Sequence, residues 1–426
     1  MTQAKRLLIR TRAMLLALLA GVLGAGAALP ALAQGAMTNP AIEVESVSLH
    51  PPAPPRERAR MNQRVFDAVW NTVNREYYDT AFNGADWRGA RARFRPQAMA
   101  ARSDAELYAV LDQMMALLRD DHASVSPPTR LLAEARSRQT RAVIGVSLRR
   151  ENGVYRIDEV REDSPAWDAR LQAGWYIISA DGAPFEPATP LSDNVPVSLA
   201  LRDEAGEVFA RTVTPRVMAP RPVFEAVWAS PEVMRLRIDG FEPGLGAWVG
   251  ATVSALPPGT PLILDFRGNA GGRLNEAQNL ISCFVPAGEV WLTRYHRRGR
   301  PQPMTLVEGC GPVRAALTNP LVVLVDQNSR SASELVPAAM QMMDRALVIG
   351  VQTPGAVLAS QDTRLPDGGR LTLSRADLRL ADGTRLEGRG VIPDRVVEIT
   401  PEDRAARRDP VLSAALEALV PEAGAR

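Results

Sequence analysis

The chain has 426 residues and a formal net charge of +2 at pH 7, from 50 Lys and Arg against 48 Asp and Glu. This near-neutral balance lacks the basic footprint of a nucleic-acid-binding protein. The length suffices for two or three domains at roughly 100 to 200 residues each. No run of His, Cys or carboxylates has metal-ligand spacing and no nucleotide fingerprint appears, so the sequence predicts neither a metal nor a cofactor.

The first residues are typical of a secretory signal peptide. Basic residues precede an apolar run over 13–29, and Ala31-Leu32-Ala33 is an A-x-A-like cleavage site. The alternative is an uncleaved anchor helix, but the run is shorter than the roughly 20 residues that a span needs. We therefore expect residues 1–33 to be removed, leaving a periplasmic or secreted chain with no stable membrane span.

Lysine occurs at one position, Lys5. Removal of 1–33 deletes four positive charges and no negative ones, so the net charge becomes −2 (2 − 4 = −2) and no lysine is left. Every mechanism that needs a lysine side chain is therefore excluded for the mature chain.

Two segments of different character follow. Residues 34–60 are rich in proline and predict an extended linker, in which His50 is expected to be inert. Residues 61–140 show apolar residues at helical spacing and predict an N-terminal helical domain.

Residues 141–220 carry short β-rich runs, with Ser164-Pro165-Ala166 and glycine turns around a buried strand. This order resembles a PDZ domain, although Gly174-Trp175 stands where that family has Gly-Asp. The resemblance implies a β-rich module that adds a substrate C-terminus as a strand and binds its carboxylate through backbone amides. The residues expected to bind it are Ile144, Gly145 and Val146.

From 221 to 402, runs of strand length alternate with helical patterns. This alternation predicts an α/β core with a mostly parallel sheet covered by helices. Residues 403–426 suggest a C-terminal helix or tail. The expected strands are 233–238, 262–266, 321–326 and 346–350, and the expected helices are 247–256, 274–284 and 333–343.

Cys283 and Cys310 are the only cysteines. In an oxidising compartment they could form a bridge worth about 3 kcal/mol. Two buried thiols are an equally supported alternative. Neither cysteine has the context of a nucleophile.

A serine stands at one strand-to-helix turn of the core. Ser331 follows the strand 321–326, and the amide of Ala332 opens the next helix, where free N–H groups favour an oxyanion. Ser331-x-x-Glu334 is also a helix capping box. From these residues alone, capping is the favoured interpretation.

A glycine-rich turn follows the strand 262–266. Gly271 and Gly272 let the backbone approach a ligand closely, so this turn could supply a second amide to the same oxyanion. Phosphate binding at a helix start is the rival interpretation, but no P-loop pattern occurs.

Four core segments resemble C-terminal processing and tail-specific proteases. Residues 265–272 resemble that family's Asp-Leu-Arg-x-Asn-x-Gly-Gly loop, and 329–334 resemble its Ser-Ala-Ser-Ala-Ser-Glu nucleophile turn. Residues 350–356 resemble Gly-Glu-x-Thr-x-Gly-Lys, and 387–394 resemble the closing Gly-x-Gly-Val-x-Pro-Asp. The resemblance covers roughly 141–400 and implies a crotonase- or ClpP-like core. It also implies that Ser331 is the nucleophile and that amides of Ala332 and Gly271 or Gly272 hold the oxyanion.

The base departs from the lysine-dyad pattern, because Ala356 stands at the lysine position. Members similar to tricorn protease use a histidine in Leu-x-Asp-x-His-x-Ser, which Leu118–Ser124 matches at His122. An imidazole with a pKa near 6.5 is suited to this role. His296 stands among arginines and is expected to be a solvated loop residue. The resemblance further implies Glu387 as the supporting carboxylate, with a plain surface carboxylate as the alternative.

The sequence therefore predicts an exported serine endopeptidase that forms an acyl-enzyme and takes proteins or peptides with free C-termini as its partners. Two non-catalytic alternatives stay open, since Ala356 replaces the usual lysine. One is a protein that binds hydrophobic ligands or peptides on the same fold. The other is a PDZ scaffold whose core is only structural.

Overall fold

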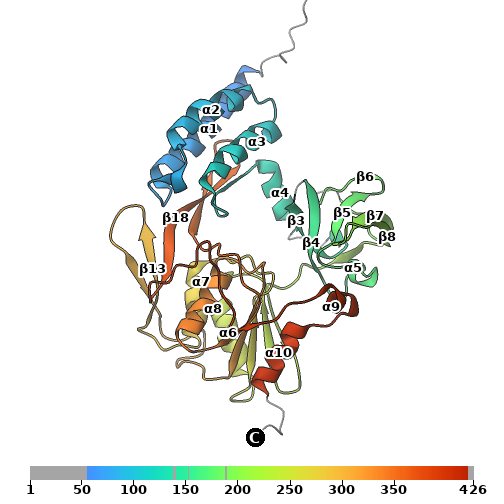
Figure 1. Ribbon diagram of the computed structural model, residues 1–426, viewed down its shortest axis with the longest axis vertical. Helices are drawn as coiled ribbons and strands as arrows, with labels where there is room; N and C mark the ends of the chain where they lie inside the picture. Colours follow the sequence, from blue (N-terminus) through green and yellow to red (C-terminus); the bar gives the residue numbers. More distant parts are fainter. Residues whose placement is uncertain (1–54, 138–140, 152, 188–189, 421–426) are drawn as a thin grey trace, which may run out of the picture. The chain divides into compact units, whose positions relative to one another are not determined.

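The computed structural model describes residues 55–137, 141–151, 153–187 and 190–420 (Figure 1). The predicted signal peptide and most of the predicted linker, including His50, lie outside these ranges. Among the described helices, none is long and apolar enough to cross a bilayer.

Three helices open the described chain: α1 (Arg56–Glu76), α2 (Trp87–Ala100) and α3 (Asp104–Met115). The first begins at Arg56, inside the segment 34–60 for which the sequence predicts a linker, and the predicted boundary is therefore too late. Arg and Glu are good helix formers, and Arg58 forms an ion pair with Asp104 of α3. That partner lies far away in the sequence, so local apolar spacing could not reveal it.

The N-terminal helices share their core with strands from the far end of the chain. Val65, Val69 and Leu107 are buried together with Leu371 and Leu373. The last two belong to β18 (Arg370–Leu380), which Figure 1 shows running from these helices toward α7 and α8. The helices predicted over 61–140 are therefore present, but their core is not self-contained.

An antiparallel sheet connects this helical region to the rest of the chain. After α3 a short 3-10 turn leads into β1 (Ser124–Ser126), which pairs antiparallel with β18 so that Ser124 faces Thr372. His122 thus lies two residues before a strand that β18 holds in place. The remaining strands of this sheet are β13 (Val290–His296), β14 (Gln302–Thr305) and β17 (Ala359–Arg364).

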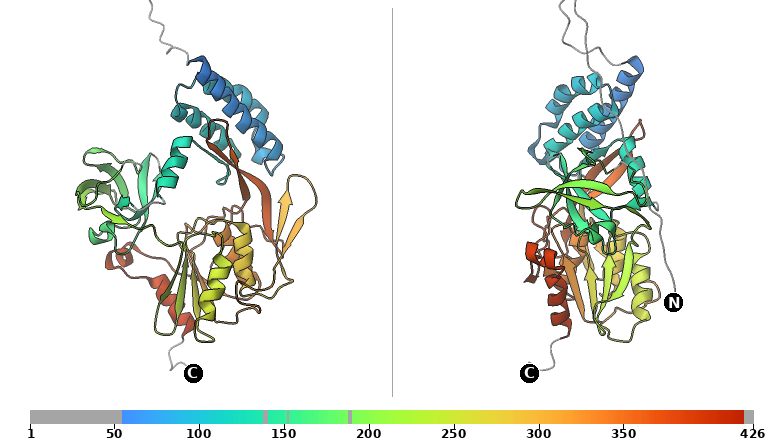
Figure 2. Two further views of the ribbon diagram at one scale, coloured as in Figure 1. Left: turned by 180° about the vertical axis from the view of Figure 1, so that it is seen from behind. Right: turned by 90° about the vertical axis from the view of Figure 1, so that its right-hand side faces the viewer.

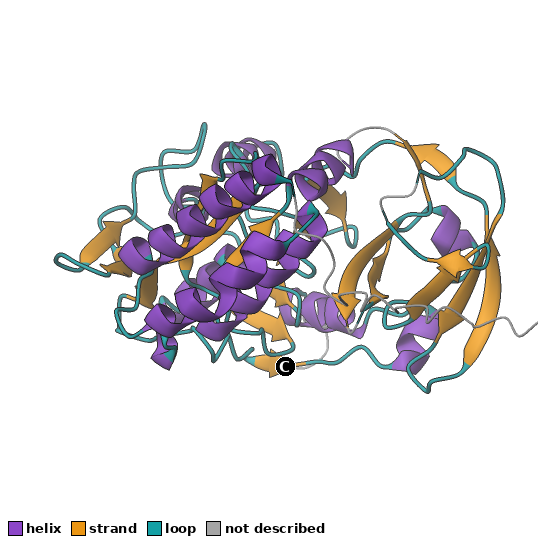
Figure 3. Ribbon diagram, turned by 90° about the horizontal axis from the view of Figure 1, so that it is seen from above, coloured by secondary structure: helices purple, strands orange, loops and turns teal. Residues whose placement is uncertain are grey.

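The segment 141–218 is rich in strands, as the sequence predicts. Its main sheet has the order β3-β4-β5-β7-β8, so β3 (Val146–Glu151) is an edge strand, and a single short helix, α5 (Pro165–Asp168), is capped by Ser164. Figure 3 shows this region as a group of strands apart from the helical layers. Its other strands are β2 (Arg141–Val143), β4 (Val154–Val160), β5 (Tyr176–Ala180), β6 (Ala183–Pro184), β7 (Val197–Arg202), β8 (Val208–Val213) and β9 (Arg216–Met218).

The core sheet has the order β10-β11-β12-β15-β16-β19, parallel except for the antiparallel edge strand β10. Its apolar runs are buried on both faces, as a covered parallel sheet requires. Its strands are β10 (Phe224–Trp228), β11 (Met234–Ile238), β12 (Leu262–Asp265), β15 (Leu321–Val325), β16 (Leu347–Gly350) and β19 (Arg395–Val396).

Helices cover both faces of this sheet (Figures 1 and 2). The helices of one face are α6 (Leu245–Ser254), α7 (Leu274–Ser282) and α8 (Ala332–Met342). On the other face lies α10 (Pro410–Leu419), which follows α9 (Pro401–Ala406) and fulfils the expectation of a C-terminal helix. The predicted strands and helices of the core agree with the observed ones to within about two residues.

Cys283 and Cys310 form a disulfide with their Cα atoms 4.9 Å apart. Of the two alternatives that the sequence leaves open, the structure therefore has the bridge. It ties the end of α7 to the loop that precedes β15.

Candidate active site

The serine predicted as nucleophile lies at a strained turn between β15 and α8. Ser331 has φ 58° and ψ −118°, a region that residues other than glycine rarely occupy. Its amide donates to the carbonyl of Ala356 at 2.8 Å. Ser329 anchors the turn to the end of β12, because its hydroxyl donates to the carbonyl of Phe266 at 2.9 Å. Ser331 is thereby fixed directly before the first helical residue, Ala332.

Glu334 does more than cap the helix. Its carboxylate accepts the amide of Ser331 at 3.0 Å, and also the Thr353 hydroxyl at 2.6 Å and the amides of Gly355 and Ala356 at 2.6 and 2.9 Å. Burial raises the pKa of Glu334, and these hydrogen bonds oppose that rise. The capping interpretation is therefore correct for Glu334, which also fastens the segment 353–356 against the serine turn.

The glycine turn lies directly against Ser331. A Cβ atom at Gly271 would lie 2.6 Å from Cβ of Ser331 and 3.2 Å from the amide nitrogen of Ala332. Gly271 also has φ +98°, so this position requires glycine for two reasons.

The amides expected to bind an oxyanion differ in their availability. The Gly271 amide donates to Oδ1 of Asn269 at 2.7 Å, so it is already satisfied. Within the described chain, the Gly272 amide has no hydrogen-bond acceptor. The Ala332 amide belongs to the first turn of α8, where no intrahelical acceptor exists. Of the two glycine amides expected from the sequence, that of Gly272 is therefore the one left available in the described chain.

His122 lies in the turn before β1, and an ion pair joins this turn to the serine turn. Arg330 Nη1 is 3.6 Å from Oδ2 of Asp121. The residue before the histidine therefore contacts the residue before the serine. Asp120 shapes the same turn by accepting the His122 amide at 2.8 Å.

The environment of the imidazole favours its neutral form. Burial lowers the pKa of His122, with Arg330 acting in the same direction, while Asp120 and Asp121 act against it. A neutral imidazole is the form that can accept a proton. Among the described residues, Nδ1 of His122 is buried and has no hydrogen-bond partner.

Glu387 contacts the segment that follows Ala356. Its Oε2 accepts the amide of Val357, the residue after Ala356, at 2.8 Å. Burial raises the pKa of Glu387 to about 7, the Val357 amide lowers it, and the Asp120 charge raises it further. In the described part of the chain no hydrogen bond joins Glu387 to His122. The carboxylate that binds His122 is that of Asp120, which accepts the His122 amide.

Two other sequence features have plain structural roles. Ala356 is buried at the lysine position. Its amide donates to Glu334, and its carbonyl accepts the Ser331 amide. His296 is an exposed residue at the end of β13, where Nε2 is 3.2 Å from Oε1 of Gln302. It is thus a solvated residue as expected, but in a strand and not in a loop.

The residues expected to bind a substrate C-terminus surround the start of β3. The Ile144 carbonyl accepts the Ala166 amide at 2.8 Å, and the Gly145 carbonyl accepts the Arg161 amide at 2.9 Å. Ile144 is buried, and Val146 begins the edge strand β3.

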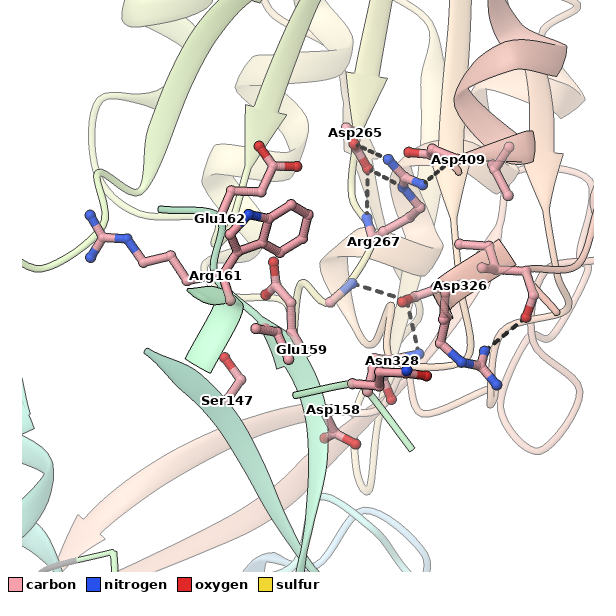
Figure 4. A pocket seen from close by; sticks show the side chains of 18 of the residues that line it. Ser147, Asp158, Glu159, Arg161, Glu162, Asp265, Arg267, Asp326, Asn328 and Asp409 are labelled. Carbon is pink, nitrogen blue, oxygen red and sulfur yellow. Dashed lines mark hydrogen bonds and ion pairs between the residues drawn. The ribbon is translucent and has the colours of Figure 1, made fainter. Parts of the chain in front are cut away.

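A cleft of about 1190 Å³ lies between β3 and the turns that follow β12 and β15. Residues of β3 and β4 line one wall, and the other wall includes Asp265, Arg267, Asp326 and Asn328 (Figure 4). Arg149 of β3 contacts the Asn328 side chain, and Glu159 of β4 binds Arg221 and Arg237 at 2.8 and 2.7 Å. The cleft therefore extends from the edge strand along a charged surface to Arg330, and Ser331 and His122 are not among the residues that line it.

Comparison with known proteins agrees with this arrangement. Residues 234–397 match peptidase family S41, and residues 58–116 match the tricorn protease C1 domain. Residues 234–397 of this chain therefore form a peptidase family S41 domain. Its enzyme class is that of a serine-type peptidase.

The curated relatives of this chain include carboxyl-terminal-processing proteases and tricorn protease homologs. A carboxyl-terminal-processing protease of Synechocystis sp. is 26% identical over 353 residues, covering 79% of this chain and 81% of that protein. The tricorn protease homolog 1 of Streptomyces coelicolor is 24% identical over 390 residues, which cover 83% of this chain and 34% of that protein.

Solved structures share the fold. The photosystem II D1 C-terminal processing protease superposes with a TM-score of 0.58 at 22% identity, over 81% of this chain and 96% of that one. The tricorn protease superposes with a TM-score of 0.51 at 16% identity, over 85% of this chain and 36% of that one. The predicted α/β fold of this family is thereby confirmed in its coarse form.

Proposed function

We propose that this protein is an exported serine endopeptidase in which Ser331 is the nucleophile and His122 the general base. The observation that carries the proposal is the contact between Arg330 and Asp121, 3.6 Å apart, because it joins the turn of the serine to the turn of the only histidine in its vicinity among the described residues. The lysine base of related enzymes is absent, since Ala356 stands in its place.

The proposed reaction is acyl transfer. His122 takes the proton of the Ser331 hydroxyl, and Oγ attacks the carbonyl carbon of a peptide bond. The amides of Ala332 and Gly272 stabilise the negative oxygen of the tetrahedral intermediate. The intermediate then collapses, and His122 returns the proton to the leaving amine as the C–N bond breaks. Water attacks the acyl-enzyme in the same way and releases the acid.

The β-rich segment 141–218 is proposed to be a PDZ-like module that recruits substrate C-termini. Support comes from the free edge of β3 and from the cleft that leads from this strand to Arg330, the residue before Ser331. A peptide added to an edge strand gains main-chain hydrogen bonds, and backbone amides near Gly145 would take its terminal carboxylate.

Export follows from the signal peptide expected over 1–33, and we propose a periplasmic or secreted location. The Cys283–Cys310 disulfide is in keeping with an oxidising compartment. Mass spectrometry of the mature protein should find an N-terminus at Gln34.

A fluorophosphonate probe tests the proposed nucleophile and base, since labelling requires an activated serine. Wild type should be labelled, and Ser331→Ala and His122→Ala should not, whereas the matched control His296→Ala should label normally. Casein hydrolysis should follow the same order. Equal labelling of wild type and Ser331→Ala would remove Ser331 from the mechanism.

Ala356 favours one alternative function, a non-catalytic protein that binds hydrophobic ligands or peptides on the same fold. In that case wild type would bind C-terminal peptides but would neither label nor cleave.

A further inference from the structure

Arg330 is a departure from the family pattern that the proposed mechanism does not use. The nucleophile turn of C-terminal processing proteases reads Ser-Ala-Ser-Ala-Ser-Glu, with alanine at the position that Arg330 occupies. The substitution puts a long cationic side chain beside the nucleophile, where its partner Asp121 directly precedes His122.

The backbone of Arg330 is rigid. Its amide donates to the carbonyl of Asn269 at 2.9 Å and to Oγ of Ser333 at 3.0 Å. Its carbonyl accepts the Ser333 hydroxyl at 2.6 Å. The guanidinium therefore extends from a fixed point on the core, and Asp121 is held relative to that point.

The histidine turn has its other attachments elsewhere. β1, two residues after His122, pairs with β18, and the Asp120 side chain accepts the His122 amide within the same turn. Neither contact involves the serine turn. Among the contacts of the described residues, the ion pair between Arg330 and Asp121 is therefore the one that joins the histidine turn to the serine turn.

The pair contributes little to folding stability. The Asp121 side chain is 74% exposed and that of Arg330 is 32% exposed, so water and salt screen their attraction. The effect of the pair on the geometry of the site is greater than its effect on stability, because a displacement of about 1 Å between reacting groups can cost on the order of 100-fold in rate.

We propose that Arg330 and Asp121 are positioning residues whose ion pair holds the His122 turn against the Ser331 turn, in place of the fixed lysine of the dyad enzymes. This inference rests on the proposed function. The pair also sets the charge around the imidazole, because Arg330 disfavours the imidazolium while Asp121 and Asp120 favour it.

The first experiment is a charge exchange measured by the rate of fluorophosphonate labelling of the full mature chain. Arg330→Gln and Asp121→Asn should each slow labelling by about 10-fold or more. The exchange Arg330→Asp with Asp121→Arg should recover part of the loss, and Arg330→Lys should retain most of the rate. The matched control is Arg395→Gln, which breaks another exposed ion pair, Arg395–Glu417 at 2.9 Å, and should label as wild type does.

The second experiment measures the pH dependence of labelling. If the two residues had a merely structural role, their substitutions would not shift the acid limb of this profile in opposite directions. Arg330→Gln removes a cation that disfavours the imidazolium, so the pKa of His122 should rise and the acid limb should move to higher pH. Asp121→Asn removes an anion that favours the imidazolium, so the acid limb should move to lower pH. Glu387 also titrates near this range, but its contribution is common to wild type and variants.

The outcomes separate this inference from the proposed function. If wild type is not labelled, the proposed function fails first. If wild type is labelled at Ser331 but Arg330→Gln and Asp121→Asn behave as Arg395→Gln does, in rate and in pH profile, only the positioning role is overturned. Near-ultraviolet circular dichroism identifies any variant that misfolds. If a single variant misfolds, the labelling rate of the exchanged pair, Arg330→Asp with Asp121→Arg, decides whether the positioning role stands.

Discussion

At the scale of single residues, the serine turn depends on positions that tolerate almost no change. Gly271 leaves no space for a Cβ atom beside Ser331 and Ala332, and its φ of +98° is unfavourable for any other residue. Ser331 itself stores strain of about 1–3 kcal/mol. Both features therefore place conformational strain at Ser331, the proposed nucleophile.

Gly271→Ala should therefore abolish fluorophosphonate labelling and lower the free energy of unfolding by about 1–3 kcal/mol. Labelling and urea unfolding measure the two effects. Gly383→Ala is the control, since Gly383 has a similar φ of +88° but open space around it. It should cost stability without abolishing labelling, and equal labelling losses in both variants would refute the steric explanation.

Glu387 gives a prediction for stability against pH. Its pKa in the folded state is raised to about 7 from an ordinary value near 4.5, mainly by burial. A carboxyl group whose pKa is raised by folding stabilises the protein when protonated, and this contribution is lost as pH rises from about 4.5 through 7.

Glu387→Gln should remove that loss. The variant should be similar to wild type at pH 4 and more stable than wild type by about 1–3 kcal/mol at pH 8. Urea unfolding at the two pH values makes the comparison. A stability difference that does not change with pH would contradict the raised pKa.

At the scale of secondary structure elements, β18 is the strand that unites distant parts of the chain. It pairs with β1 next to the histidine turn, and it packs against α1–α3 through Leu371 and Leu373. The position of His122 is therefore determined by residues almost 250 positions later. The core of the N-terminal helices and the geometry of the site depend on the same strand.

Leu371→Ala should cost about 2–5 kcal/mol of stability, because this side chain is fully buried. It should also slow labelling at temperatures where the protein is still folded, since the anchor of β1 is weakened. The control is Leu132→Ala, whose side chain is 59% exposed and which should change neither property. A loss of stability with an unchanged labelling rate would show that β18 does not position the histidine.

The secondary structure of the core was predictable because each strand is a short apolar run followed by a polar or glycine turn. The run 321–325 and the helix that begins at Ala332 illustrate this local pattern. The pairing of β1 with β18 and the dependence of the N-terminal helices on Leu371 were not predictable, because they connect segments without any shared local signal.

The candidate site shows the same division. Ser331 and His122 stand in short motifs that the sequence displays. The Asp121–Arg330 ion pair and the hydrogen bonds of Glu334 to Thr353, Gly355 and Ala356 are long-range contacts. Two contacts have a local signal, because Asp120 belongs to the histidine motif and Glu334 to the capping box that begins at Ser331.

At the scale of the whole molecule, the Cys283–Cys310 bridge joins α7 to the segment before β15. A bridge of this kind stabilises typically by about 2–4 kcal/mol, chiefly by restricting the unfolded chain. Cys283→Ala with Cys310→Ala should lower the melting temperature by several degrees. Dithiothreitol should lower that of wild type and leave the double variant unchanged, and an equal effect on both would show that the bridge is not formed.

The pairing of β1 with β18 also bears on when the enzyme becomes active. In the proposed export, the N-terminal end of the chain emerges from the translocation channel first, so His122 arrives long before β18, the strand that pairs with β1 beside it. Hydrolytic activity must then wait until nearly all of the chain has crossed. Under the proposed mechanism, the order of assembly would by itself delay hydrolysis until the chain has been exported.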